Sequence, residues 1–146
     1  MRIYIGADHR GFELKNKLAD FLRQQTYDVV DKGNTIYDAD DDYPIFADAV
    51  ARAVAQDRDA RGIVVCGSGV GVDIAANKVD GVRAGLCQTP EQATAARRDD
   101  NINVLALAAD FVDDAVARAI AGAFVSTQFD KASRHQRRVD EIGQIS

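Results

Sequence analysis

A cysteine followed by alternating glycines is the part of the chain whose residue types best suit chemistry. The segment GIVVCGSGVGVDIAANK (62–78) predicts a buried strand, a glycine-rich turn and a helix. Gly67, Gly69 and Gly71 let backbone N–H groups turn toward a ligand, and the helix adds the positive end of its dipole. The turn indicates an anion site, unless the glycines only permit a tight connection. It matches neither the P-loop pattern GxxxxGK(S/T) nor a dinucleotide-binding GxGxxG after the first strand.

Cys66 ends the predicted strand and directly precedes this loop. A thiolate that faces an amide-rich loop can act as a nucleophile or as a base. The plainer interpretation is a small buried apolar residue. Cys87 receives only that plainer interpretation, because no comparable loop follows it.

Polar residues also stand beside two other predicted elements. GADHRG (6–11) places Asp8 and His9 just past the first predicted strand, where they could contact sugar hydroxyls or cap the next helix. Tyr43 stands immediately before a predicted helix, after an acidic run that we expect to be a solvated loop.

Two arginines near the C-terminus could bind a phosphate group. Arg134 and Arg138 lie one helical turn apart within SRHQRRVDEI (133–142). Their planar donor forks can converge on one phosphate. Alternatively, they belong to an exposed basic helix end that pairs with Asp140 and Glu141.

Short apolar runs alternate with amphipathic stretches along the chain. These are the strands and helices that must position the candidate residues. We expect strands at residues 2–6, 27–31, 62–67, 82–87 and 103–108. We expect helices at residues 12–24, 45–56, 90–98 and 111–126. Several strands lack a polar face, which is typical of strands buried on both sides of a parallel sheet. The sequence predicts an α/β fold: one Rossmann-like, doubly wound domain over residues 1–146, with a mainly parallel five-stranded sheet flanked by helices.

Ligands of such sheets bind at the carboxyl ends of the strands. We therefore expect four polar segments to lie around one edge of the sheet. These are residues 8–10, 66–71, 88–89 and 99–103.

The composition limits the partners and the compartment. A formal net charge of −5 is unfavourable for binding nucleic acid or an anionic membrane. No apolar run approaches the roughly 20 residues of a membrane span, and two cysteines without a CxxC motif indicate reduced thiols. We expect a cytoplasmic protein with neither a membrane nor a nucleic-acid partner. We expect no structural zinc site, since the chain has only two histidines.

Taken in order, these segments resemble the ribose-5-phosphate isomerase B family, which includes the galactose-6-phosphate isomerase subunits. The similar segments are GADHRGFELK, DDDYPIF, VCGSGVGVDIAANKVDGVRA, NVLALA and RHQRRVDEI. The resemblance spans nearly the whole chain and does not depend on the glycine loop alone. It implies an aldose–ketose isomerase of a small sugar phosphate that needs no metal or cofactor. It also implies active sites at the interface of a homodimer, or of a dimer of dimers.

The resemblance implies a role for each candidate residue. Cys66 would be the base that moves a proton between C1 and C2 through an enediolate, and Ser68 would relay a proton between substrate oxygens. Loop amides would hold the developing oxyanion. The implied loop contacts are Gly67, Gly69, Val70 and Gly71. Asp8, His9 and Tyr43 would contact the sugar, and Arg134 and Arg138 would bind the phosphate.

Asp99 and Asp100 depart from the family pattern, since they stand where the family commonly has a His-Asn pair whose histidine opens the furanose ring. Asp99 could replace that histidine as the acid–base catalyst if burial beside Asp100 raises its pKa above the ordinary value of about 3.9. Otherwise the substrate needs no ring opening, as with a tetrose 4-phosphate.

Asp110 also departs from the pattern, because many members carry a phosphate-binding arginine there. A carboxylate in the phosphate subsite should weaken phosphate binding unless Arg137, Arg97 or Arg98 compensates. Alternatively, Asp110 is the N-cap of a helix that begins at Phe111.

We therefore expect an aldose–ketose isomerase, with ribose 5-phosphate and ribulose 5-phosphate as the default pair. A tetrose phosphate, a hexose phosphate and an unphosphorylated sugar are the alternative substrates. A non-catalytic sugar-phosphate-binding module is the alternative from another class. The three aspartates favour that module, whereas Cys66, Ser68 and the glycine loop oppose it.

Overall fold

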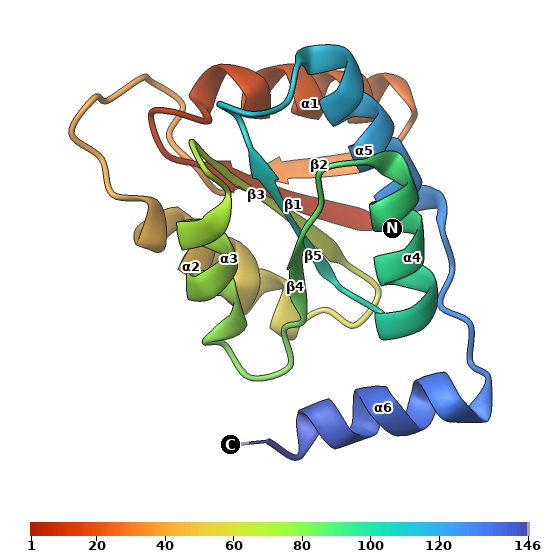
Figure 1. The fold of residues 1–146 in the computed structure, drawn as a ribbon. Coiled ribbons are helices and arrows are strands. Elements are labelled where there is room, and N and C mark those ends of the chain that lie inside the picture. Colours follow the sequence, from red (N-terminus) through yellow and green to blue (C-terminus); the bar gives the residue numbers. More distant parts are fainter. Residues whose placement is uncertain (146) are drawn as a thin grey trace.

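The computed structural model describes residues 1–145 and contains one sheet of five parallel strands (Figure 1). The strands are β1 (Arg2–Ala7), β2 (Asp28–Asp31), β3 (Arg61–Cys66), β4 (Ala84–Leu86) and β5 (Val104–Ala108). Their order across the sheet is β2-β1-β3-β5-β4, and each neighbouring pair is parallel. The predicted doubly wound α/β fold is confirmed.

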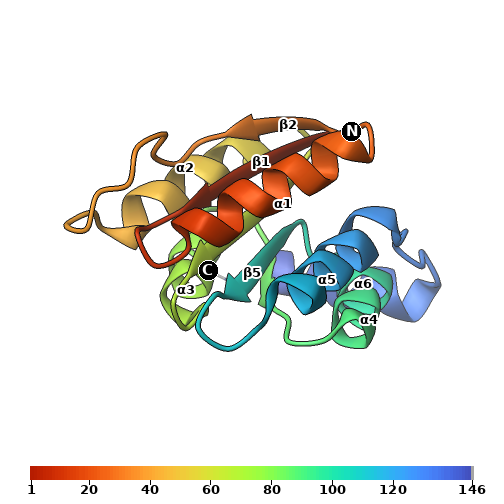
Figure 2. The same cartoon turned by 90° about the horizontal axis from the view of Figure 1, so that it is seen from above.

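Helices cover both faces of this sheet (Figure 2). They are α1 (Phe12–Gln24), α2 (Tyr43–Ala55), α3 (Val70–Asn77), α4 (Pro90–Asp100), α5 (Asp114–Ser126) and α6 (Ser133–Gly143). One buried cluster joins the sheet to α1, α4 and α5, and a second joins it to α2 and α3. Within residues 1–145 no helix combines the length and the apolar character that a membrane crossing requires.

The central strand β3 explains why the predicted strands lack a polar face. Ile63 and Val65 belong to the cluster under α1 and α5, whereas Val64 and Cys66 belong to the cluster under α2 and α3. Successive side chains of a strand point to opposite faces, so a sheet covered on both faces needs apolar residues at every position.

The edge strand β4 is held from outside by a side chain of α3. The side-chain Nδ2 of Asn77 donates to the carbonyl of Ala84 at 3.1 Å, and the side-chain Oδ1 accepts from the Ala84 N–H at 2.8 Å. Asn77 therefore occupies backbone groups that a further strand would otherwise pair.

The switch in chain direction lies between β1 and β3. From β1 the chain continues to β2 on one side, and from β3 it continues to β4 on the other side. The loops after β1 and β3 therefore diverge at the carboxyl edge, which is where open α/β sheets bind ligands. These two loops carry Asp8, His9 and the glycine loop after Cys66.

The expectation that residues 99–103 lie at this carboxyl edge is wrong. Helix α4 begins at Pro90 beside the carboxyl end of β4, and it runs back against the strand direction. It ends at Asp100, next to the start of β5. Helix α6 also lies beyond that amino edge, apart from the sheet (Figure 1).

The interpretation of Asp110 as a helix N-cap is also wrong. Helix α5 begins at Asp114, and the carboxylate of Asp113 caps it by accepting the N–H of Val116 at 2.8 Å. Residues 109–113 instead form a turn beside the glycine loop, because the N–H of Asp110 donates to the carbonyl of Gly67 at 3.0 Å.

A buried lysine fixes the long loop between β2 and α2. Lys15 has an exposed fraction of 0%. Its ammonium group lies 2.9 Å from the Asp31 carboxylate and donates to the carbonyl of Asn34 at 2.5 Å. Because Asp31 ends β2 and Asn34 lies in the loop, this pair ties the start of the loop to α1.

Lys15→Met should lower the free energy of unfolding by about 3 kcal/mol, because it leaves the Asp31 carboxylate without its buried cation. Urea denaturation measures the change, and Lys15→Met/Asp31→Asn should recover part of the loss. Lys17→Met is the matched control, since Lys17 is exposed and pairs with Asp114 at 2.7 Å. The control should cost less than about 1 kcal/mol. Equal losses in the two lysine variants would contradict this account.

Candidate active site

Cys66 and the glycine loop form the centre of the candidate site. The thiol lies at the carboxyl end of β3 and is buried, and the N–H of Gly69 donates to its Sγ at 3.2 Å. Gly69 has φ +75°, a left-handed conformation that side chains disfavour, and this turn aims its N–H at the sulfur. Ser68 is exposed, and its Oγ accepts the N–H of Val70 at 3.3 Å. Thiol, hydroxyl and helix N-terminus therefore share one short loop.

Cys87 lies in a different environment. It is 1% exposed, and burial together with the nearby Asp73 raises the pKa of its thiol to about 11. Cys87 therefore stays protonated at neutral pH, which agrees with a structural role.

Tyr43 reaches the same loop from α2. It is the first residue of that helix, and it is partly exposed. Its ring lies against Gly71, since a Cβ added there would approach the ring carbons to 2.5 Å and the hydroxyl to 2.9 Å. The Tyr43 hydroxyl is thus held at the N-terminal end of α3.

Asp8 fixes the turn between β1 and α1. It is buried, and its Oδ1 accepts the N–H groups of Arg10 at 3.0 Å and of Gly11 at 3.2 Å. Asp8 therefore closes the turn before α1. The interpretation of Asp8 as a helix cap is wrong, because the N-cap of α1 is Gly11 and no side chain caps this helix. The contact of Asp8 with a sugar remains a prediction.

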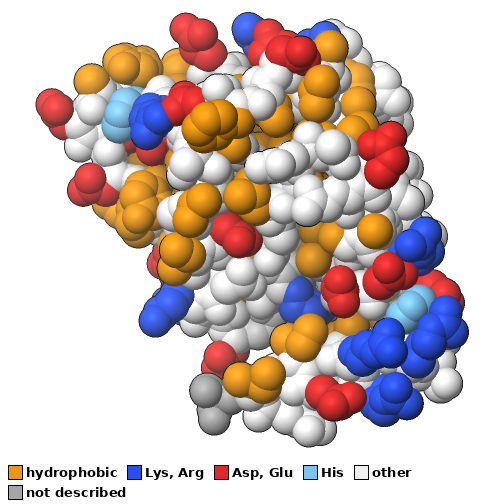
Figure 3. All heavy atoms as spheres, viewed as in Figure 1, with side chains coloured by type: hydrophobic (Ala, Val, Ile, Leu, Met, Phe, Trp, Pro, Cys, Tyr) orange, Lys and Arg blue, Asp and Glu red, His pale blue; other side chains and the backbone are white. Residues whose placement is uncertain are grey.

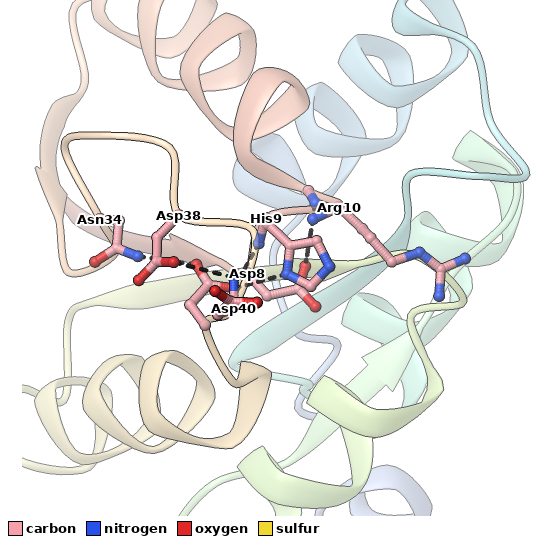
Figure 4. Close-up of polar contacts among 8 residues, drawn as sticks. Asp8, His9, Arg10, Asn34, Asp38 and Asp40 are labelled. Atoms are coloured by element: carbon pink, nitrogen blue, oxygen red, sulfur yellow. Dashed lines mark hydrogen bonds and ion pairs between the residues drawn. The ribbon is translucent and has the colours of Figure 1, made fainter.

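His9 is held by an aspartate that the sequence did not single out. The Asp41 carboxylate lies 2.8 Å from both the N–H and the Nδ1 of His9, and its other oxygen accepts from Asn34 at 2.8 Å. The Asp41 side chain is only 7% exposed, so the expectation of a solvated loop is wrong for this residue. The hydrogen bond to Asp41 raises the pKa of His9. Figure 4 shows Asn34, Asp38 and Asp40 on the loop beside His9.

The acidic run gives little sequence signal for this contact. Four aspartates lie between positions 38 and 42, and only the fold decides which one turns inward. Arg10 was missed for the same reason. It forms an ion pair with Asp110, which is 100 positions away in the sequence.

The remaining candidates form a second group at the amino edge. Asp99 lies 2.9 Å from the guanidinium of Arg98 and 3.6 Å from the Nε2 of His135, a buried residue of α6. The hydrogen bond from Arg98 lowers the pKa of Asp99, which is opposite to the rise considered from the sequence. Asp99 is therefore a carboxylate at neutral pH.

Arg134 and Arg138 are exposed on α6, where Figure 3 shows basic side chains gathered. Asp100 lines a cleft of about 910 Å³ between α6 and the β4 edge, together with Leu86 and Ile142. Within residues 1–145 no group of three or more His, Cys, Asp or Glu side chains could hold a metal ion.

The structure therefore divides the candidate residues between the two ends of the sheet. The carboxyl-edge group is Asp8, His9, Tyr43, Cys66, Gly67, Ser68, Gly69, Val70, Gly71 and Asp110. The amino-edge group is Asp99, Asp100, Arg134 and Arg138. One chain does not bring the two groups together.

Comparison with known proteins covers almost the whole chain. A family model described as Ribose/Galactose Isomerase matches residues 3–142. The chain is 45% identical over 144 residues to ribose-5-phosphate isomerase B of Mycolicibacterium paratuberculosis, with 99% of this chain and 91% of that one covered. It is 40% identical over 144 residues to ribose-5-phosphate isomerase B of Escherichia coli, with 99% and 95% covered.

Solved structures are equally similar. Ribose-5-phosphate isomerase B of Mycoplasma genitalium, with bound ribulose-5-phosphate, has a TM-score of 0.94 at 44% identity, with 98% of this chain and 94% of that one covered. Ribose-5-phosphate isomerase B of Clostridium thermocellum has a TM-score of 0.94 at 41% identity, with 99% and 96% covered.

Asp41→Asn should lower the pKa of His9 toward its ordinary value of 6.5. Because folding raises this pKa, the pair stabilises the fold fully below pH 6.5, and the contribution is lost as the pH rises through the raised value. NMR titration of the imidazole Cε1–H signal measures the pKa, and His9→Gln identifies the His9 signal. An identical His9 pKa in the wild type and in Asp41→Asn would contradict the assignment.

Proposed function

Because the chain belongs to the ribose/galactose isomerase family, we propose that it interconverts ribose 5-phosphate and ribulose 5-phosphate through an enediolate, with Cys66 as the base. It acts as an aldose–ketose isomerase in one domain over residues 1–146, in the cytoplasm. The observation that carries the proposal is Cys66 itself, which lies at the switch point of the sheet and accepts the N–H of Gly69 from the glycine loop. The relative with bound ribulose-5-phosphate supports the choice of substrate.

The reaction moves one proton between carbons and one between oxygens. The Cys66 thiolate takes the proton from C2 of the aldose and returns it to C1, which forms the ketose. Ser68 passes the hydroxyl proton from O2 to O1. The loop amides hold the negative charge that develops on the oxygens, and each such donor contributes roughly 3 kcal/mol.

The carboxyl-edge group would also hold the sugar. Tyr43 presents its hydroxyl beside Gly71, and His9 presents its ring from the opposite loop. A protonated His9 donates from both ring nitrogens, so one can bind Asp41 while the other binds a sugar hydroxyl. Asp8 supports this arrangement by fixing the turn that carries His9.

We infer a homodimer from the division of the candidate residues. A complete site forms if the amino edge and α6 of one subunit meet the carboxyl edge of the other. The cleft between α6 and β4 exposes apolar residues such as Ile142, which is 46% exposed, and a second copy would cover them. Arg134 and Arg138 of the partner subunit would then bind the phosphate.

Asp99 would open the furanose ring as a base. Ring opening breaks the C1–O4 bond: the proton of the anomeric hydroxyl leaves O1 and the ring oxygen O4 gains a proton. A carboxylate with a lowered pKa is present in the ionised form that accepts the proton from O1, and it can return that proton to O4. A carboxylate of low pKa is a weak base. This favours a second candidate substrate, a tetrose 4-phosphate, which cannot close a furanose ring and needs no ring opening.

NMR in deuterated water tests the activity with ribose 5-phosphate, erythrose 4-phosphate, a hexose phosphate and free ribose. We expect conversion of ribose 5-phosphate with deuterium entering at C1 or C2. Cys66→Ala should lower kcat by about 10²–10⁴-fold, since it removes the base. Cys87→Ala is the matched control and should keep the rate. Turnover confined to another sugar would make that sugar the substrate in place of ribose 5-phosphate. Absence of both turnover and exchange would favour a binding module.

Mixing two inactive variants tests the shared site. Cys66→Ala disables the carboxyl edge, and Arg134→Ala/Arg138→Ala disables α6. Randomly mixed dimers should recover about one quarter of the wild-type activity, because half are heterodimers and one of their two sites is intact. Size-exclusion chromatography checks that dimers form. A dimeric mixture without any recovery would show that each site lies within one chain.

A further inference from the structure

One permanent cation faces the loops around Cys66. Four loops follow β1, β3, β4 and β5 at the carboxyl edge, and Arg10 is the only lysine or arginine in them. These loops are residues 8–11, 67–69, 87–89 and 109–113. The remaining loop at this edge contains Lys32, whose ammonium lies over the ring of Tyr4 at 5.8 Å. An anion bound beside Cys66 on this chain would therefore meet Arg10.

The Arg10 guanidinium lies directly over the glycine loop. A Cβ added at Gly67 would collide with its Cζ, Nε and Nη2 atoms, so this glycine leaves the space that the arginine occupies. Figure 4 shows the Arg10 side chain extending away from His9. A planar cation therefore covers Gly67, the residue that follows Cys66 in the chain.

Asp110 holds the guanidinium in this position. Its carboxylate pairs with Nη2 of Arg10. Its backbone is fastened to the same loop, because the N–H of Asp110 donates to the carbonyl of Gly67 at 3.0 Å and the N–H of Ala109 donates to the carbonyl of Cys66 at 2.9 Å. An exposed ion pair contributes little to stability, so the consequence of this pair is mainly the orientation of Arg10.

Donors remain for a ligand. A guanidinium has five N–H donors, and among the described residues Asp110 is the one side-chain acceptor that Arg10 binds. The Arg10 side chain is 55% exposed. Its free donors lie in one plane, an arrangement that suits two oxygens of a phosphate.

We propose that Arg10 binds the phosphate group of the substrate and that Asp110 is the positioning residue that holds its guanidinium over Gly67. The inference rests on the proposed function and adds a residue to its substrate site. Asp110, expected from the sequence to oppose phosphate binding, instead supports it through Arg10. Phosphate would then be held by Arg10 from one side and by Arg134 and Arg138 from the partner subunit on the other.

Calorimetry on full-length protein carrying Cys66→Ala tests this without turnover. Adding Arg10→Ala should weaken binding of ribose 5-phosphate and of inorganic phosphate by roughly 10- to 100-fold, the loss expected for a hydrogen-bonded charge. Arg52→Ala is the matched control, since Arg52 is an exposed arginine that pairs with Asp48 on α2. It should leave both affinities unchanged. Unchanged affinities in Arg10→Ala would overturn the proposal.

Asp110→Ala tests the positioning role. It should lower phosphate affinity when Arg10 is present and should not lower it in Arg10→Ala, and absence of this coupling would overturn the positioning role. A swapped variant, Arg10→Ala/Asp110→Arg, returns a guanidinium to the same place from the other loop and should recover most of the lost phosphate affinity. Failure of this swap in a folded protein would overturn the placement of the phosphate beside Gly67.

In the enzyme with Cys66 intact, Arg10→Ala should raise KM for ribose 5-phosphate by a large factor. It should lower kcat for free ribose much less, because free ribose carries no phosphate for Arg10 to bind. If the unmodified enzyme turns over no sugar while Arg10→Ala still weakens phosphate binding, the proposed function fails and the Arg10 assignment stands.

Discussion

The close contact between the turn before α1 and the end of β3 is the constraint on which the carboxyl edge depends. A Cβ added at Gly11 would lie 2.8 Å from the carbonyl oxygen of Val65, so no side chain fits between the two. This contact sets the loop that carries His9 and Arg10 against the loop that follows Cys66. The buried Lys15–Asp31 pair then fixes the next loop, which brings Asp41 to His9. Packing of one turn therefore brings the loops after β1, β2 and β3 together at the carboxyl edge.

Local sequence patterns were sufficient for the fold and for the centre of the candidate site. Apolar runs without a polar face predicted the parallel sheet, because burial on both faces is visible residue by residue, as in β3. The glycines after Cys66 predicted the amide-rich loop, since their effect on the backbone is also local. The prediction was wrong where direction mattered. Helix α4 has the same pattern whichever way it runs, yet its direction moves Asp99 to the opposite end of the sheet.

Contacts between distant residues could not be predicted from one sequence. Nothing in the acidic run distinguishes Asp41 from its neighbours until the fold brings it to His9. Likewise, Asp110 was judged without Arg10, because a partner 100 positions away leaves no periodic signal. A substitution that looks unfavourable at one position can thus be compensated by a residue that only the tertiary structure places beside it.

The short outer edge of the sheet also determines how copies of this chain can associate. Strand β4 has three residues, and the Asn77 side chain already occupies both backbone groups of Ala84. A second chain therefore finds no row of free backbone groups along β4, and strand addition at this edge of the sheet is blocked. Contacts between copies on this side of the sheet therefore form through side chains. Side-chain contacts can close on themselves by symmetry and give discrete particles, whereas a ladder of added strands keeps a free edge and can go on growing.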